Sequence, residues 1–98
     1  MYKSIILIQA RDDIKEAAQW YNMRSAGLGK KFTSDVFKKV SSIVENPNAI
    51  SIRYDEVRTI VLDKLPYMIH YTIDENNKLV IVSSVLHTSR SSKLWRNR

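Results

Sequence analysis

Few side chains in this sequence of 98 residues can move a proton near neutral pH. Its only two histidines are His70 and His87, and 16 lysines and arginines supply cations. No carboxylate cluster accompanies either histidine, and HExxH and EF-hand patterns are absent, which argues against a metal site. Histidine, tyrosine, lysine and arginine are enough for metal-free acid–base chemistry, such as attack of a ribose 2′-hydroxyl on its own phosphate.

The motifs of common cofactor-dependent enzymes are missing. Neither GxxxxGK[ST] nor GxGxxG occurs, and the sequence contains only two glycines. The absence of cysteine excludes disulfides, thiolate zinc sites and cysteine nucleophiles, and it is compatible with a reducing cytosol. Neither histidine lies near a serine in a nucleophile-elbow context. We therefore expect no cofactor and no metal.

The chain is basic, with a net charge of +6 and a pI near 9.7. This excess favours a polyanionic or acidic partner, although a solvated basic surface is the alternative. The charge is densest in a tail over residues 88–98, which has four basic residues and no acidic one. Trp95 in this tail can stack on a base, enter a partner's groove or fold back on the core. The predicted target-binding residues are Arg90, Lys93, Trp95, Arg96 and Arg98.

The length favours a single domain over residues 1–98. The longest apolar run, residues 5–8, is far shorter than the roughly 18 residues of a membrane span, so no membrane partner is expected. The first residues do not form a secretory signal, and we expect a cytoplasmic protein.

Apolar periodicity predicts a strand over residues 2–9 followed by two amphipathic helices. Asp13 and Glu16 fit a capping box that starts the first helix, at about residues 13–24. Asn46-Pro47 ends the second helix, because proline cannot continue it. The expected buried stripes are Ile14, Ala17, Ala18 and Tyr21 in the first helix, and Phe32, Val36, Val40 and Ile43 in the second.

The rest of the chain predicts a loop and then three strands, over residues 57–62, 67–73 and 79–86. In the middle strand the alternation predicts one face formed by Tyr67, Ile69, Tyr71 and Ile73. Short connections make these strands antiparallel neighbours. The predicted fold is therefore α+β, in the order βααβββ, with two helices packed on one face of a mainly antiparallel sheet.

Six short motifs in this order resemble the RelE/ParE superfamily of bacterial type II toxin–antitoxin toxins. They cover nearly the whole chain and are Ala10-x-x-Asp13-Ile14-x-x-Ala17 with Trp20-Tyr21, Gly27-Leu28-Gly29 with Phe32, Glu45-Asn46-Pro47, Val57-Arg58, Pro66-Tyr67-x-Ile69-x-Tyr71, and Val85-x-His87-x-x-Arg90. The resemblance implies a toxin that forms a hetero-oligomer with a cognate antitoxin, whose C-terminal segment wraps the helices and the sheet. The last two motifs are closer to the ParE-like branch, which inhibits DNA gyrase by binding.

The RelE-like branch, which cuts mRNA on the ribosome, is the alternative. The strand positions that would carry its catalytic basic residues are Thr59, Val61 and Met68, none of which can stabilise a phosphate. A nuclease would instead have to use His87, with Arg90 and Arg58 as phosphate cations. A non-toxic basic module that binds nucleic acid is the third hypothesis.

Several of the polar residues have structural interpretations as well. Tyr67 and Tyr71 are expected to pack in the core, and His70, on the other face of its strand, is expected to have a structural role. Arg58 can pair with a nearby acid, namely Asp55, Glu56 or Asp63. The lysines of the second helix are expected to form a solvated face.

Overall fold

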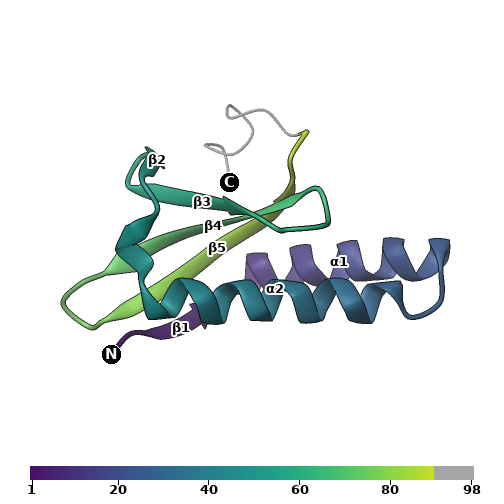
Figure 1. The fold of residues 1–98 in the computed structure, drawn as a ribbon, viewed down its shortest axis with the longest axis horizontal. Coiled ribbons are helices and arrows are strands. Elements are labelled where there is room, and N and C mark those ends of the chain that lie inside the picture. The colour runs from purple at the N-terminus through teal and green to yellow at the C-terminus, as the bar shows by residue number, and fades with distance from the viewer. Residues whose placement is uncertain (90–98) are drawn as a thin grey trace.

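The computed structural model describes residues 1–89 (Figure 1). Two helices cover one face of a five-stranded sheet, which confirms the predicted α+β fold. The elements in chain order are β1 (Lys3–Ile6), α1 (Ile8–Arg24), α2 (Leu28–Glu45), the 3₁₀ helix η1 (Pro47–Ala49), β2 (Ile52–Tyr54), β3 (Val57–Val61), β4 (Tyr67–Asp74) and β5 (Leu79–His87). Within this part of the chain, no helix is long and apolar enough to cross a membrane.

The strands are arranged in the order β1-β5-β4-β3-β2. Pairing is antiparallel except between β1 and β5, which are parallel. The side chains of β4 alternate as predicted: Ile69 and Tyr71 are buried in the main core, whereas Met68 belongs to a small second cluster with Leu86 and Tyr54. The sheet therefore has a helix-covered face and an opposite face.

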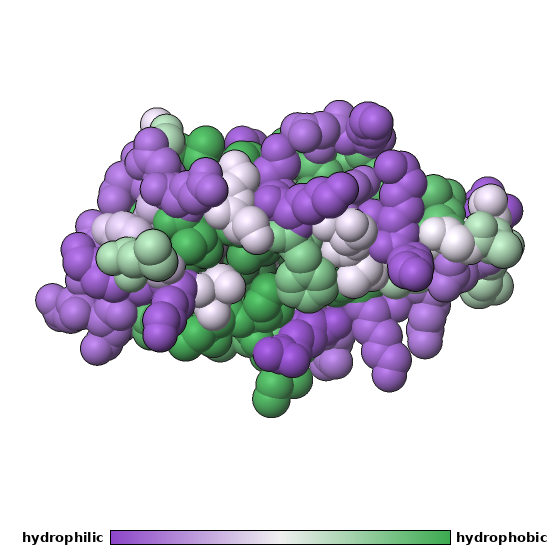
Figure 2. Space-filling view, turned by 60° about the horizontal axis from the view of Figure 1, so that its bottom comes forward, coloured by the Kyte–Doolittle hydropathy of each residue, from purple (hydrophilic) through white to green (hydrophobic). Residues whose placement is uncertain are grey.

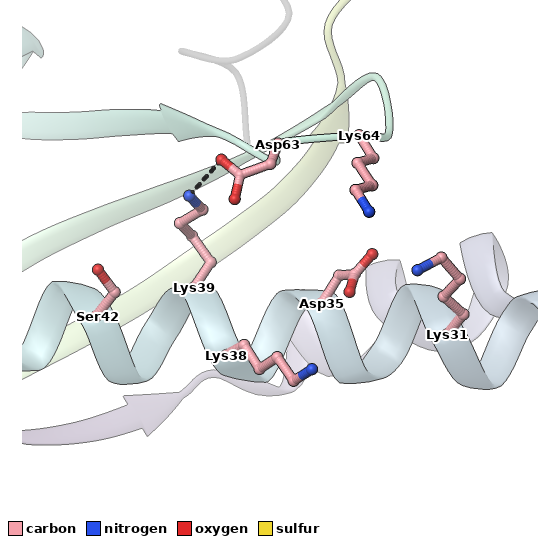
Figure 3. A pocket seen from close by; sticks show the side chains of 7 residues that line it. All are labelled: Lys31, Asp35, Lys38, Lys39, Ser42, Asp63 and Lys64. Atoms are coloured by element: carbon pink, nitrogen blue, oxygen red, sulfur yellow. Dashed lines mark hydrogen bonds and ion pairs between the residues drawn. The ribbon is translucent and has the colours of Figure 1, made fainter.

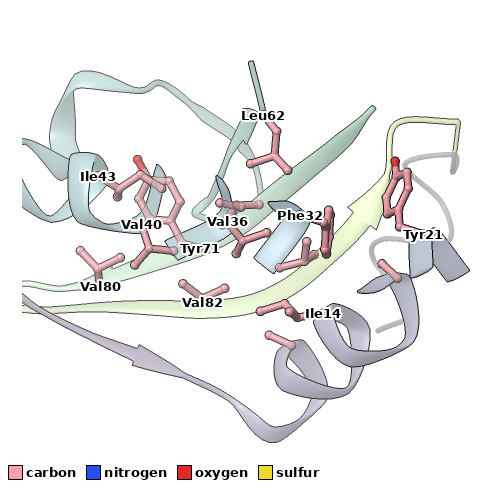
Figure 4. Close-up of a cluster of buried hydrophobic side chains, with 14 residues drawn as sticks. Ile14, Tyr21, Phe32, Val36, Val40, Ile43, Leu62, Tyr71, Val80 and Val82 are labelled. Atoms are coloured by element: carbon pink, nitrogen blue, oxygen red, sulfur yellow. The ribbon is translucent and has the colours of Figure 1, made fainter. Parts of the chain in front are cut away.

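The core lies between the helices and the sheet (Figure 4). Both predicted helix stripes point into it, and Phe32 and Val36 have no exposed surface. Burial of such apolar side chains is the main stabilising contribution of the fold. Tyr71 spans the layers, because its hydroxyl donates a 2.9 Å hydrogen bond to the carbonyl of Pro47 in η1.

The prediction for the start of the first helix is wrong. β1 ends at Ile6 and α1 begins at Ile8, with Leu7 at the N-cap and no side-chain cap. Asp13 lies inside the helix, where its Oδ2 accepts a 3.0 Å hydrogen bond from the backbone N–H of Val85. Asp13 and Glu16 therefore do not form a capping box, because the carboxylate of Asp13 satisfies a donor of β5 instead.

The short strand β2 was not predicted, because the segment between Pro47 and Val57 was expected to form a loop. It pairs antiparallel with β3 and forms an edge of the sheet. Asp55 and Glu56 make the connecting turn with φ angles of +41° and +67°. Such turns favour glycine or asparagine, so the sequence carries no strong hairpin signal here.

The two glycines have different roles at the helix–helix connection. Gly27 has a φ of +87°, which side chains rarely adopt. Gly29 allows α1 and α2 to approach closely, because a Cβ added there would lie 2.3 Å from the carbonyl oxygen of Ala18. Its N–H also donates a 2.8 Å hydrogen bond to Oδ1 of Asn22. The glycine pair thus permits both the turn and the packing.

Candidate functional site

His87 lines a groove of about 530 Å³ between α1 and the ends of β4 and β5. Apolar and aromatic side chains form most of this groove, including Trp20, Tyr21 and Tyr67, and Glu16 stands among them. Trp20 is 48% exposed and lies under the guanidinium of Arg24, which is 4.5 Å from its ring centroid. An exposed aromatic beside a groove is typical of an interaction surface.

The His87 ring is held from two sides. It packs edge-on against Tyr67, with 5.2 Å between the ring centroids, and its Nδ1 accepts a 3.0 Å hydrogen bond from the N–H of Ser89. When Nδ1 is an acceptor, the neutral ring carries its proton on Nε2. In this arrangement Nε2 is a donor, so His87 is positioned to donate a hydrogen bond to a ligand in the groove.

Arg58 lies on the same face of the sheet as the helices, because it pairs directly with Tyr71 of the core. Its Nε and Nη1 are buried, and among residues 1–89 they have no hydrogen-bond partner. It lines a small pocket of about 140 Å³ near Glu56 and Glu75. Of the three acids that were possible partners for Arg58, Asp63 pairs instead with Lys39 at 2.8 Å.

The electrostatics around Tyr71 reflect both its burial and its neighbour Arg58. Desolvation raises the pKa of the Tyr71 hydroxyl above 10.0, and the nearby positive charge of Arg58 partly offsets this shift. Burial also raises the pKa of Tyr21, with a smaller contribution from Tyr67. These tyrosines stay protonated at neutral pH and serve as packing groups, and Tyr71 also donates its hydrogen bond to Pro47.

His87 and Arg58 are not brought together. His87 pairs with Tyr67 and Arg58 with Tyr71, four positions apart along β4, which corresponds to about 13 Å. The two side chains also line different pockets. Arg90, the third candidate for a nuclease, lies outside the described residues, as do Lys93, Trp95, Arg96 and Arg98.

The opposite face of the sheet carries the positions where a RelE-like nuclease would need basic residues. Thr59 pairs with His70, and Val61 pairs with Met68. His70 is fully buried, with its Nδ1 3.1 Å from the hydroxyl of Tyr54, in agreement with the structural role expected for it. Among residues 1–89, no group of three or more potential metal ligands comes together.

Sequence reasoning missed a third pocket, of about 350 Å³, on α2 (Figure 3). Helix periodicity places Lys31, Asp35 and Lys38 on one stripe, but the periodicity gives no reason to add residues from another segment. The loop after β3 contributes Asp63 and Lys64 to the same pocket. The expected solvated lysine face is confirmed for Lys30, Lys31 and Lys38, which are exposed. It is wrong for Lys39, whose ammonium is held by Asp63 and whose side chain is only 17% exposed.

Comparison with solved structures places this architecture in one class. A chain described as "Chromosomal ParDE TA system from P. aeruginosa" matches with a TM-score of 0.79 and 17% identity, over 91% of this chain and 98% of that one. The isolated E. coli RelE toxin matches with a TM-score of 0.68 and 20% identity, over 99% of this chain and 95% of that one. A chain of the intact E. coli RelBE toxin–antitoxin complex matches with a TM-score of 0.69 and 20% identity, over 92% of this chain and 100% of that one. The chain therefore has the fold shared by RelE and ParE toxins.

The sequence then identifies the family within this class. Residues 5–92 match the family model described as "ParE toxin of type II toxin-antitoxin system, parDE". Because this match covers most of the chain, the protein belongs to the ParE toxin family, which confirms the resemblance drawn from its motifs. No curated protein matches the sequence.

Proposed function

We propose that this ParE-family toxin inhibits DNA gyrase by binding it in the cytoplasm, and that a cognate antitoxin neutralises the toxin by forming a hetero-oligomer with it. The family match supports the ParE-like branch over the RelE-like one.

One geometric observation carries the choice of binding over RNA cleavage. Metal-free cleavage of RNA needs a base, an acid and a cation around a single phosphate. His87 and Arg58 line separate pockets and pair with positions of β4 that are about 13 Å apart, and Nδ1 of His87 accepts the hydrogen bond from Ser89. This separation supports a toxin that acts through its surface.

The proposed antitoxin contact uses the exposed apolar side chains around the end of β1. Ile5, Leu7 and Ile8 are all exposed, Ile8 to 78%, and β1 is an edge strand. Figure 2 shows hydrophobic side chains gathered on one face among polar ones. A patch of this kind beside an unpaired strand edge suits a partner chain. Two of the similar solved structures are described as toxin–antitoxin assemblies.

The direct test is a supercoiling assay with purified gyrase and the purified toxin. Inhibition that is reversed by the product of the adjacent reading frame is the expected result. In cells, induced expression should produce filamentation and DNA-damage signalling. Immediate translation arrest with mRNA cut at a defined codon position would instead identify a nuclease, and harmless expression would identify a non-toxic nucleic-acid-binding module.

A further inference from the structure

From the lysine pocket on α2, defined by Lys31, Asp35, Lys38, Lys39, Ser42, Asp63 and Lys64, we infer a binding site for the phosphate backbone of duplex DNA. The inference deepens the proposed function and rests on it, because gyrase acts on duplex DNA. A toxin that also contacts this DNA would have a higher effective concentration at its target.

The positive side chains of the pocket come from two segments. Lys31 and Lys38 are seven residues apart on α2, which separates their backbones by about 10 Å along the helix axis. Lys64 reaches towards α2 from the loop after β3, and in Figure 3 its ammonium group and that of Lys31 point towards the space beside Asp35. The pocket thus presents cations both from α2 and from the loop that faces it, an arrangement that suits an extended anion such as a phosphate backbone.

The ion pair between Lys39 and Asp63 fixes this arrangement. Their 2.8 Å contact joins α2 to the loop that carries Lys64. Asp63 neutralises Lys39, so that three further lysines of the pocket, Lys31, Lys38 and Lys64, outnumber its one remaining carboxylate, that of Asp35. The local charge stays positive after the internal pair is counted, which favours an anionic ligand.

The composition of the pocket favours nucleic acid over an acidic protein segment. All seven lining residues are charged or polar, whereas the centre of a protein–protein interface is typically apolar and poor in charge. Interfaces with DNA are instead polar and positively charged. Lysine binds phosphate as a point charge and needs no fixed orientation of the phosphate oxygens. The pocket contains lysines and no arginine.

Fluorescence anisotropy with a short labelled DNA duplex tests the site. The pocket variant combines Lys31→Gln, Lys38→Gln and Lys64→Gln. The control variant combines Lys3→Gln, Lys15→Gln and Lys30→Gln. It removes the same amount of charge from exposed lysines outside the pocket. The pocket variant should bind more weakly, and the slope of log K against log salt should become shallower by about 2–3, at about 0.9 per lost phosphate contact. The control should keep the wild-type slope.

Equal losses in the two triple variants would overturn the inference, because they would show an effect of net charge alone. Absence of DNA binding by the wild-type protein would also overturn it. If the pocket variant loses binding to a polyglutamate peptide but keeps its DNA affinity, the site takes an acidic protein segment instead. Gyrase inhibition by the wild-type toxin is measured separately, so the failure of the proposed function is distinguished from the failure of the DNA site.

Discussion

Asp13 of α1 accepts a 3.0 Å hydrogen bond from the backbone N–H of Val85 in β5, across 72 residues of sequence. The bond joins the first helix to the sheet beside the groove that His87 lines. Val85 is only 2% exposed, so its N–H depends on this carboxylate for a partner. The position of α1 on the sheet, and with it the shape of the groove, therefore depends on one polar contact as well as on apolar packing.

Asp13→Ala is expected to lower the free energy of unfolding by about 1–3 kcal/mol, because it leaves a buried donor without its acceptor. Asp13→Asn keeps an acceptor oxygen and should cost less. Urea denaturation measures both, with Asp12→Ala as the matched control on the exposed side of the same helix turn. Equal losses for Asp12→Ala and Asp13→Ala would contradict a specific role for the Val85 contact.

Gly29→Ala should destabilise the helix pair more than Gly27→Ala does. A Cβ at position 29 would meet the backbone oxygen of Ala18 at 2.3 Å, so the helices must move apart, at a cost of about 1–3 kcal/mol or more. At position 27 the space is open, and only the φ of +87° opposes a side chain, at roughly 1 kcal/mol. Thermal denaturation of the two variants gives the order, and a milder effect at Gly29 would argue against close helix packing.

The stability of the protein should fall on the acid side in part through Asp63. Its hydrogen bond from Lys39, and then the charge of Lys39, lower the pKa of this carboxyl below its ordinary value of 3.8. The folded state binds this proton less readily than the unfolded state, so the stabilisation is present above pH 3.8 and is lost as the pH falls through the lowered pKa. Asp63→Asn should flatten the acid limb of a plot of unfolding free energy against pH relative to the wild-type protein. An acid limb that is the same in Asp63→Asn and in the wild type would exclude the ion pair as its cause.

Tyr21 and Tyr71 should ionise late in an alkaline spectrophotometric titration. Burial raises the pKa of Tyr21 and of Tyr71 above 10.0. Each phenol therefore contributes stability that is complete below pH 10.0 and is lost as the pH rises through the folded pKa. Tyr71→Phe should remove one late-ionising group and cost about 1–2 kcal/mol, because the Pro47 carbonyl loses its donor. Late ionisation that persists unchanged in Tyr71→Phe would contradict the assignment.

The parts of this fold that follow from local periodicity could be predicted from the sequence. Phe32, Val36 and Val40 recur at helical spacing, and Ile69 and Tyr71 alternate along a strand, so each pattern records which face is buried. The start of α1 could not be found in this way, because Asp13 is used by Val85, a partner distant in sequence. Local capping rules cannot register such a tertiary contact.

The candidate sites show the same limit. His87 could be selected because it ends a strand beside a basic tail, but its distance from Arg58 depends on the register of β3, β4 and β5. The lysine pocket also depends on tertiary structure, because Lys64 reaches α2 only after the sheet has placed its loop there. Sequence patterns identify residues of suitable chemistry, whereas the pairing of strands decides which of them meet.

His87→Ala gives the sharpest separation between a gyrase-binding toxin and a ribonuclease. Loss of a general acid or base lowers the rate of an enzyme by about 10²-fold or more, so a nuclease that depends on His87 should lose its toxicity. We expect the variant to remain toxic and to inhibit gyrase in the supercoiling assay, because binding is spread over a surface. Tyr67→Leu is the matched control for lost packing, since it removes the ring that contacts His87 and leaves the imidazole in place. If His87→Ala abolishes growth arrest and still binds gyrase as the wild-type toxin does, while Tyr67→Leu, equally well folded, keeps its toxicity, His87 acts chemically and the binding mechanism is wrong.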